Sequence, residues 1–161
     1  MPWGPFVIEW IHILLGIFWF GSALYATVVL APVVMGLGPS VRRELLTALM
    51  GRASLVLVWA GYLTVTAGFI RGTVFGRIQS TDVLFGTRYG VVWLAAFGVG
   101  VFLALWSHLV LRRSALKMIT MPAPGAMPAG AMPARPDPIP RIVEMVGFFV
   151  LFTFMIVLKF S

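Results

Sequence analysis

Two histidines lie inside long apolar runs of this sequence, where they are the side chains best suited to bind a metal or move a proton. His12 lies between Glu9 and Gly16, and His108 lies near the end of a later run. An ionisable group is costly to bury in an apolar helix and therefore indicates a functional site. Imidazole ligates haem iron, so His12 predicts a haem or metal site. The alternatives are a hydrogen bond from His12 to a threonine or backbone carbonyl of a neighbouring helix, and a proton relay.

Depth in the expected helices decides which side chains can share a site. His12 lies about seven residues from the outer end of its run and His108 about three from the inner end of its own, so their heights differ by roughly 15 to 20 Å at 1.5 Å per residue. They cannot both ligate one iron. Met155 lies at the depth of His12, which predicts it as a second axial ligand, although methionine also commonly fills gaps between helices.

Arginines at the same level have two interpretations. Arg71 and Arg88 would pair with haem propionates or simply anchor helix ends. For His108 we expect a partner in water, a lipid headgroup or Glu144, and its alternative is the ligand of a second haem near the inner face. A second haem there would give the protein electron transfer across the whole membrane.

The elements that must position these residues are transmembrane helices. The mean hydropathy is +1.00, with 60% hydrophobic and 11% charged residues, well outside the range of soluble globular proteins. Four apolar runs each approach the roughly 20 residues that cross a bilayer as a helix. We predict an all-α fold, a four-helix transmembrane bundle forming one integral membrane domain over residues 1–161. The helices are expected at about 5–34, 53–75, 89–111 and 142–160.

The charge distribution predicts how this bundle is oriented. A net charge of +7 would suggest nucleic acid in a soluble protein, but here the basic residues flank the apolar runs, so we expect no nucleic-acid partner. Eight of the twelve lie around the first and third connections and four around the other ends. The positive-inside rule then places both termini outside and these connections in the cytoplasm, in the plasma (inner) membrane of a bacterial cell.

The third connection, residues 121–140, is a linker rich in proline, alanine and methionine. Its methionines, together with one just before it, suggest Cu(I) as an alternative ligand, because thioethers favour soft metals: Met118, Met121, Met127 and Met132. The sequence has no cysteine, which excludes disulfides, thiolate metal sites and covalently attached haem. Nucleotide-binding and hydrolase motifs are also absent from the sequence.

Small residues mark the faces along which helices can approach closely. Ala96, Gly100 and Ala104 recur every four residues, and His108 continues the same stripe. In a protein without a cofactor, this stripe would dock another subunit. Gly16, one turn from His12, leaves that face with little bulk, which indicates either a helix contact or room for a flat ligand.

The first two apolar runs resemble one group of membrane proteins. Trp10-Ile11-His12, then Trp19-Phe20-Gly21 with Pro32 closing the helix, resembles the first helix of CopD-like proteins and their HemJ-type and PuuD-type relatives. Arg52 to Gly61 and Thr66 to Gly68 resemble their second helix. The resemblance covers about the first 70 residues and implies a four-helix bundle that binds b-type haem or handles copper, with His12 as the family's first-helix histidine.

Taken together, these patterns predict a membrane b-type haem protein in electron transfer. It would act with other membrane or redox subunits, or as a homodimer, rather than as an independent enzyme. The alternatives are a CopD-like copper-handling protein and a cofactor-free structural subunit of a membrane complex.

Overall fold

Helices account for nearly all of the chain that the computed structural model describes, which comprises residues 3–113, 116 and 137–161. Four stretches are long and apolar enough to cross a membrane: Trp3–Gly36, Ala53–Thr73, Arg88–Leu111 and Ile139–Lys159. The predicted all-α, four-helix bundle is confirmed. The elements are α1 (Trp3–Tyr25), η1 (Ala26–Leu30), α2 (Ala31–Gly36), α3 (Pro39–Thr73), α4 (Thr81–Gly86), α5 (Arg88–Trp106), η2 (Ser107–Leu111) and α7 (Ile139–Lys159).

The second long helix begins well before the apolar run that predicted it. We expected it from residue 53, but α3 begins at Pro39, and only Leu37 and Gly38 separate it from α2. Proline suits the first turn of a helix, where its missing N–H costs no hydrogen bond. The next residues include good helix formers such as Leu45 and Leu46. Hydropathy alone missed this polar first part of the helix.

Arg42 explains why the turn before α3 is so short. Its guanidinium donates hydrogen bonds to the carbonyls of Val34 (3.1 Å), Met35 (2.8 Å) and Leu37 (2.9 Å). The last carbonyls of a helix have no partner within it. Arg42 therefore caps the end of α2 from the first turn of α3 and holds the two as a helical hairpin.

Pro32 does not end the first helix, as its position suggested. The chain passes through it in one continuous helical stretch, with a π-helical turn, η1, directly before it. The N–H of Ala31 bonds to the carbonyl of Ala26, five residues earlier. Proline removes one hydrogen bond and crowds the preceding turn, and a wider π turn makes room for it. A second π turn, η2, ends the α5 helix and carries His108.

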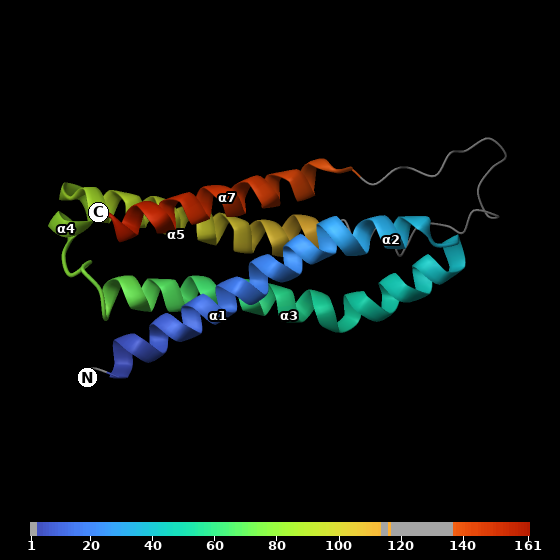
Figure 1. Cartoon of the computed structure of the whole chain (residues 1–161), viewed down its shortest axis with the longest axis horizontal. Helices are drawn as coiled ribbons and strands as arrows, with labels where there is room; N and C mark the ends of the chain where they lie inside the picture. Colours follow the sequence, from blue (N-terminus) through green and yellow to red (C-terminus); the bar gives the residue numbers. More distant parts are fainter. Residues whose placement is uncertain (1–2, 114–115, 117–136) are drawn as a thin grey trace.

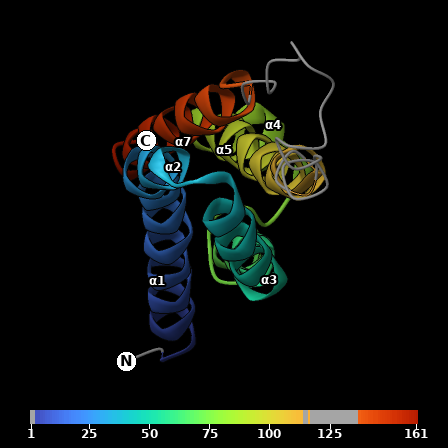
Figure 2. The ribbon, with the colours of Figure 1, turned by 90° about the vertical axis from the view of Figure 1, so that its right-hand side faces the viewer.

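The helices are arranged as two pairs joined along α3 and α5 (Figure 1). Helix α1 packs along α3, and α5 packs along α7. The start of α1 and the end of α7 lie at one end of the bundle, as four crossings require, and the α2–α3 hairpin projects beyond the other helices at the opposite end. Helix α1 crosses near the middle of α7 and diverges from it toward the N-terminus (Figure 2).

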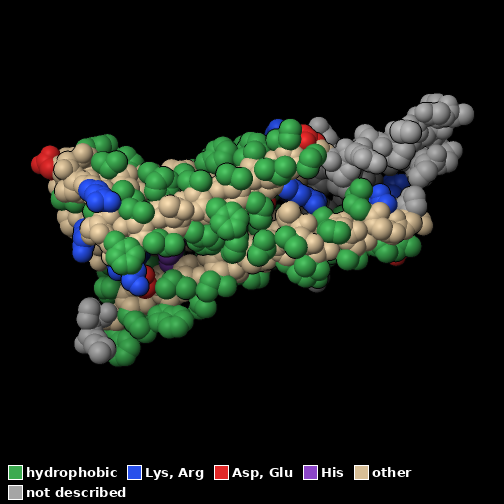
Figure 3. All heavy atoms as spheres, turned by 45° about the horizontal axis from the view of Figure 1, so that its top comes forward, with side chains coloured by type: hydrophobic (Ala, Val, Ile, Leu, Met, Phe, Trp, Pro, Cys, Tyr) green, Lys and Arg blue, Asp and Glu red, His purple; other side chains and the backbone are tan. Residues whose placement is uncertain are grey.

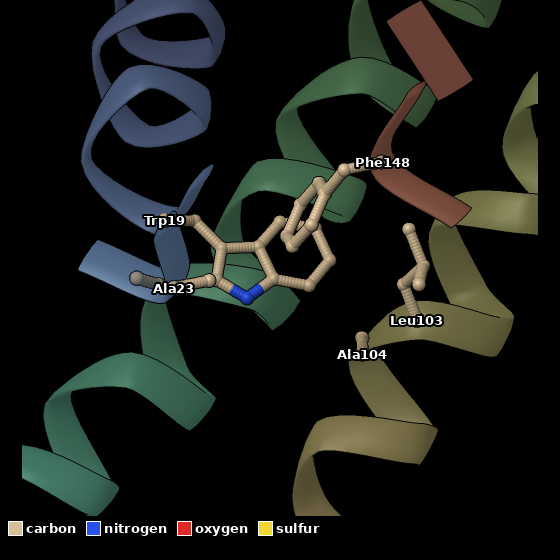
Figure 4. Packing of buried hydrophobic residues seen from close by; sticks show 6 residues of the cluster. Trp19, Ala23, Leu103, Ala104 and Phe148 are labelled. Atoms are coloured by element: carbon tan, nitrogen blue, oxygen red, sulfur yellow. The ribbon is translucent and has the colours of Figure 1, made fainter. Parts of the chain in front are cut away.

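The core lies where α1 crosses the other helices. Trp19 packs edge-on against Phe148 of α7, with ring centroids 4.9 Å apart, and both contact the region of Leu103 and Ala104 on α5 (Figure 4). A methyl group at Gly61 would lie 2.9 Å from the Trp19 indole, so α3 approaches this ring through a glycine. Tight packing of this kind, rather than hydrophobic exclusion from water, associates helices in lipid.

The small-residue stripe of α5 is used inside this bundle. Ala96, Gly100 and Ala104 are all buried, and a methyl at Gly100 would lie 3.4 Å from Val65 of α3. The expectation that this stripe docks another subunit is therefore wrong, because α3 already occupies it.

Large apolar side chains cover the outside of the molecule instead (Figure 3). Ile17, Phe149 and Ile156 are each more than 60% exposed. Apolar exposure on this scale is unfavourable in water, whereas lipid tails surround such a surface at no cost. The protein is an integral membrane protein with its apolar surface in the bilayer.

Candidate functional site

The imidazole of His12 is bound to α3 rather than projecting into open space. Its Nδ1 lies 2.9 Å from the backbone carbonyl oxygen of Thr64. A carbonyl oxygen can only accept, so Nδ1 carries a hydrogen, and in the neutral ring Nε2 carries the lone pair. The hydrogen bond from His12 to a backbone carbonyl of a neighbouring helix, which was the alternative interpretation of this residue, is confirmed.

Glycine lets α1 and α3 come close enough for this bond. A methyl group at Gly68 would lie 2.8 Å from Cε1 of His12, so the ring rests directly on the α3 backbone. One turn along α1, a methyl at Gly16 would lie 3.7 Å from the Thr64 methyl. Of the two interpretations of the small face beside His12, the structure confirms a helix contact.

The Thr64 hydroxyl is engaged within α3. It is buried and donates to the carbonyl of Ala60 at 2.7 Å, one turn earlier in α3. Thr64 therefore holds His12 through its backbone carbonyl, whose position is set by the helix.

Toward the N-terminal end of α1, Glu9 forms an ion pair with Arg71 of α3. The two side chains are 44% and 39% exposed. Arg71 was predicted to pair with a haem propionate or to anchor a helix end, and Glu9 was not considered. A signal for this pair existed, because Glu9 lies three residues before His12 and so shares its helix face.

Met155, the predicted second axial ligand, belongs to α7, from which α1 diverges toward its N-terminus. Helix α1 contacts α7 around Phe20, whose ring centroid lies 4.8 Å from that of Phe152. From there α1 diverges from α7 toward His12 (Figures 1 and 2). Met155 is 40% exposed. The pairing of His12 with Met155 stays a prediction.

Arg88 lies at the start of α5 with an exposed side chain, at the end of the bundle where α1 begins. The methionines proposed for copper, Met118, Met121, Met127 and Met132, lie outside the described residues. Within the described part of the chain, no three His, Cys, Asp or Glu side chains come together to hold a metal ion.

His108 lies in a separate polar cluster. Its Nδ1 lies 2.9 Å from the Tyr62 hydroxyl of α3. The expected partner, Glu144, instead accepts a 2.7 Å hydrogen bond from the Ser107 hydroxyl. Adjacent residues of a helix point in different directions, so η2 turns Ser107 toward α7 and His108 toward α3. The expected pairing of His108 with Glu144 is wrong for this reason.

The two histidines therefore occupy different interfaces of α3. His12 joins α1 to α3 beside Gly68, whereas His108 joins η2 to α3 at Tyr62. No single metal ion is held between them. Trp106, whose indole N–H donates to the Pro140 carbonyl at 3.0 Å, ties the end of α5 to the start of α7 beside the second cluster.

Fold and site together define a class: a four-helix integral membrane protein with two histidine sites within the apolar bundle. Comparison with protein-family models, with curated proteins and with solved structures gave no match.

Proposed function

We propose that the protein binds one b-type haem through Nε2 of His12 and passes electrons as a subunit or partner of a larger redox complex. The membrane would be the plasma membrane of a bacterial cell, with both termini outside. The observation that supports this proposal best is the bond from Nδ1 of His12 to the Thr64 carbonyl. Histidines that ligate metals usually donate their other N–H to such an acceptor, which orients the ring and makes the ligating nitrogen more basic.

The surroundings of His12 fit a haem in two further respects. Gly68 lets the imidazole lie against α3, so its orientation does not depend on a mobile neighbour. Arg71 lies three residues beyond Gly68 on α3, where its guanidinium is a suitable partner for a propionate if it exchanges Glu9 for that group. Arg88 is the second candidate for the same role. When bound, haem supplies one-electron redox chemistry, and these residues bind and orient it.

In the proposal His12 would supply one ligand of the haem. Met155 of α7 stays the candidate from this chain for the other ligand, and a partner subunit or a second copy of the chain is the alternative source.

An absorption spectrum of purified protein tests the proposal. We expect a Soret band and a reduced-minus-oxidised difference in wild type, both lost in His12→Ala. His108→Ala is the matched control and should keep both bands. A colourless wild-type preparation would overturn haem binding: if it contains copper, the copper-handling alternative is supported, and if it is free of metal, the cofactor-free subunit is.

A further inference from the structure

A second polar cluster lies at the opposite end of the bundle from His12 and is independent of any haem. It consists of two hydrogen-bonded pairs, Ser107 with Glu144 and His108 with Tyr62. Ser107 and His108 are adjacent on η2, the π turn that ends α5. Single π turns within α-helices occur frequently at functional sites.

Glu144 is the least expected member of this cluster. Its side chain is only 5% exposed, although it belongs to a helix that crosses the membrane. Within the described chain the one ion pair joins Glu9 and Arg71, so the carboxyl group of Glu144 is held by a neutral hydroxyl rather than by a cation. An acid inside a membrane helix is retained at a cost and marks proton or ion pathways.

Both pairs tolerate a change of protonation. A hydroxyl can donate to a carboxylate and can accept from a carboxylic acid, so the Ser107–Glu144 bond exists in either state. The phenol of Tyr62 can likewise donate to or accept from Nδ1 of His108, so neither tautomer is excluded. The Thr64 carbonyl gives His12 no such freedom.

Glu144 is close to the end of the bundle where α7 begins. Glu144 lies five residues after Ile139, the first residue of α7, which is about 8 Å along a helix. The charged side chain that acts on Glu144 is Arg141, about one turn earlier on α7. On the α5 side, His108 and Arg112 follow Ser107 in the sequence. On α1, which also packs against α7, the titratable residue at this level is Tyr25, and its side chain is exposed.

We propose that Glu144 and Ser107 form an intramembrane proton-exchange site, open to the end of the bundle where α7 begins. In the exchange, the O–H bond of the Glu144 carboxylic acid breaks and the proton passes to water at that end. The Ser107 hydroxyl rotates from accepting the carboxyl proton to donating to the carboxylate. No electrons move, and the cycle reverses by uptake of one proton from the same side.

Infrared difference spectroscopy of the full chain in lipid, recorded across a series of pH steps, tests this site. We expect a carbonyl stretch of a protonated carboxyl group that appears and disappears reversibly with pH and shifts in D2O. Glu144→Gln should abolish it. Ser107→Ala should keep the band but shift its frequency, because the carboxyl group then lacks its hydrogen-bond partner.

Glu44→Gln is the matched control, since Glu44 is an exposed acid on the first part of α3. It should leave the band unchanged. The proposal is overturned if wild type shows no reversible carboxyl band, or if the band survives in Glu144→Gln. If Glu144→Gln folds poorly, Glu144→Asp serves instead and should retain a band at an altered frequency; an unchanged band in this variant would contradict the assignment to Glu144.

Discussion

The two histidines have the same side chain in similar apolar surroundings, yet their hydrogen-bond partners give them different chemistry. His12 meets a backbone carbonyl, which only accepts, and so it is held as one tautomer with a free Nε2. His108 meets a phenol, which donates or accepts, beside a serine and a buried acid. The hydrogen-bond partner therefore fixes the hydrogen on Nδ1 of His12, whereas it leaves the tautomer of His108 open.

The backbone also accommodates the two rings differently. At His12, α3 offers Gly68, so the ring replaces a missing side chain and the helix stays regular. At His108, the helix that carries the ring changes to a π turn. The first arrangement keeps both helices in regular α geometry, whereas a π turn is a local departure from it.

Trp19 lies in the core between these two regions, and its loss should have the largest effect on stability. It is 2% exposed and packs on Gly61 and Phe148. Trp19→Ala removes the contacts of a whole indole and should destabilise the bundle by on the order of 3 kcal/mol, measured by unfolding in a denaturing detergent. The loss of stability arises from the cavity that the missing indole leaves.

Phe18→Ala is the matched control for this change. Phe18 is the preceding residue and is 47% exposed on the apolar surface, so lipid should replace its contacts with little loss. Equal destabilisation by both variants would show that the Trp19 cluster is not the core that separates the two sites.

Gly68→Ala should act on the His12 region alone. The added methyl would lie 2.8 Å from Cε1 of His12, so the ring must move and its bond to the Thr64 carbonyl must weaken. If His12 binds haem, loss of this support should lower haem affinity by about 10- to 100-fold, as for other groups that orient a metal ligand. Haem titration of the apoprotein measures the change.

Gly98→Ala provides the comparison, because a methyl there meets nothing within 4 Å. It should bind haem like wild type. The pH-dependent infrared band assigned to Glu144 should persist in both glycine variants. If Gly68→Ala abolishes that band, the two regions are coupled and the contrast between them fails.

The number of helices and the position of His12 at a helix contact were predictable because both follow from local patterns of apolar and small residues. The early start of α3 was not, because hydropathy does not register a polar helical turn that begins at Pro39 and is tied back by Arg42. Pro32 suggested that the first helix ends there, but a π turn directly before it lets the helical stretch continue to Gly36.

Contacts between distant residues were harder to predict. The Glu9–Arg71 and Tyr62–His108 pairs depend on how each helix is rotated about its axis and where the helices cross. Depth alone placed Met155 at the level of His12, and it gave no indication that α1 diverges from α7 toward the N-terminus (Figures 1 and 2). The depth of a residue in the membrane follows from its position along its own helix, whereas a crossing angle depends on how two helices pack against each other.

The smallest effect is expected at the Glu9–Arg71 ion pair. Because both side chains are over a third exposed, water and salt screen their attraction, and exposed pairs contribute about 0.2 to 1 kcal/mol. Glu9→Gln should therefore change the stability of the apoprotein by less than about 1 kcal/mol, with a difference that shrinks as salt is added. Arg88→Gln, which removes an arginine at the same end of the bundle, is the control and should show no such salt dependence.

If haem binds at His12, Glu9→Gln also frees Arg71 for a propionate, so haem affinity should be kept or raised. A fall in affinity would instead show that the ion pair itself holds α1 in the position that His12 requires.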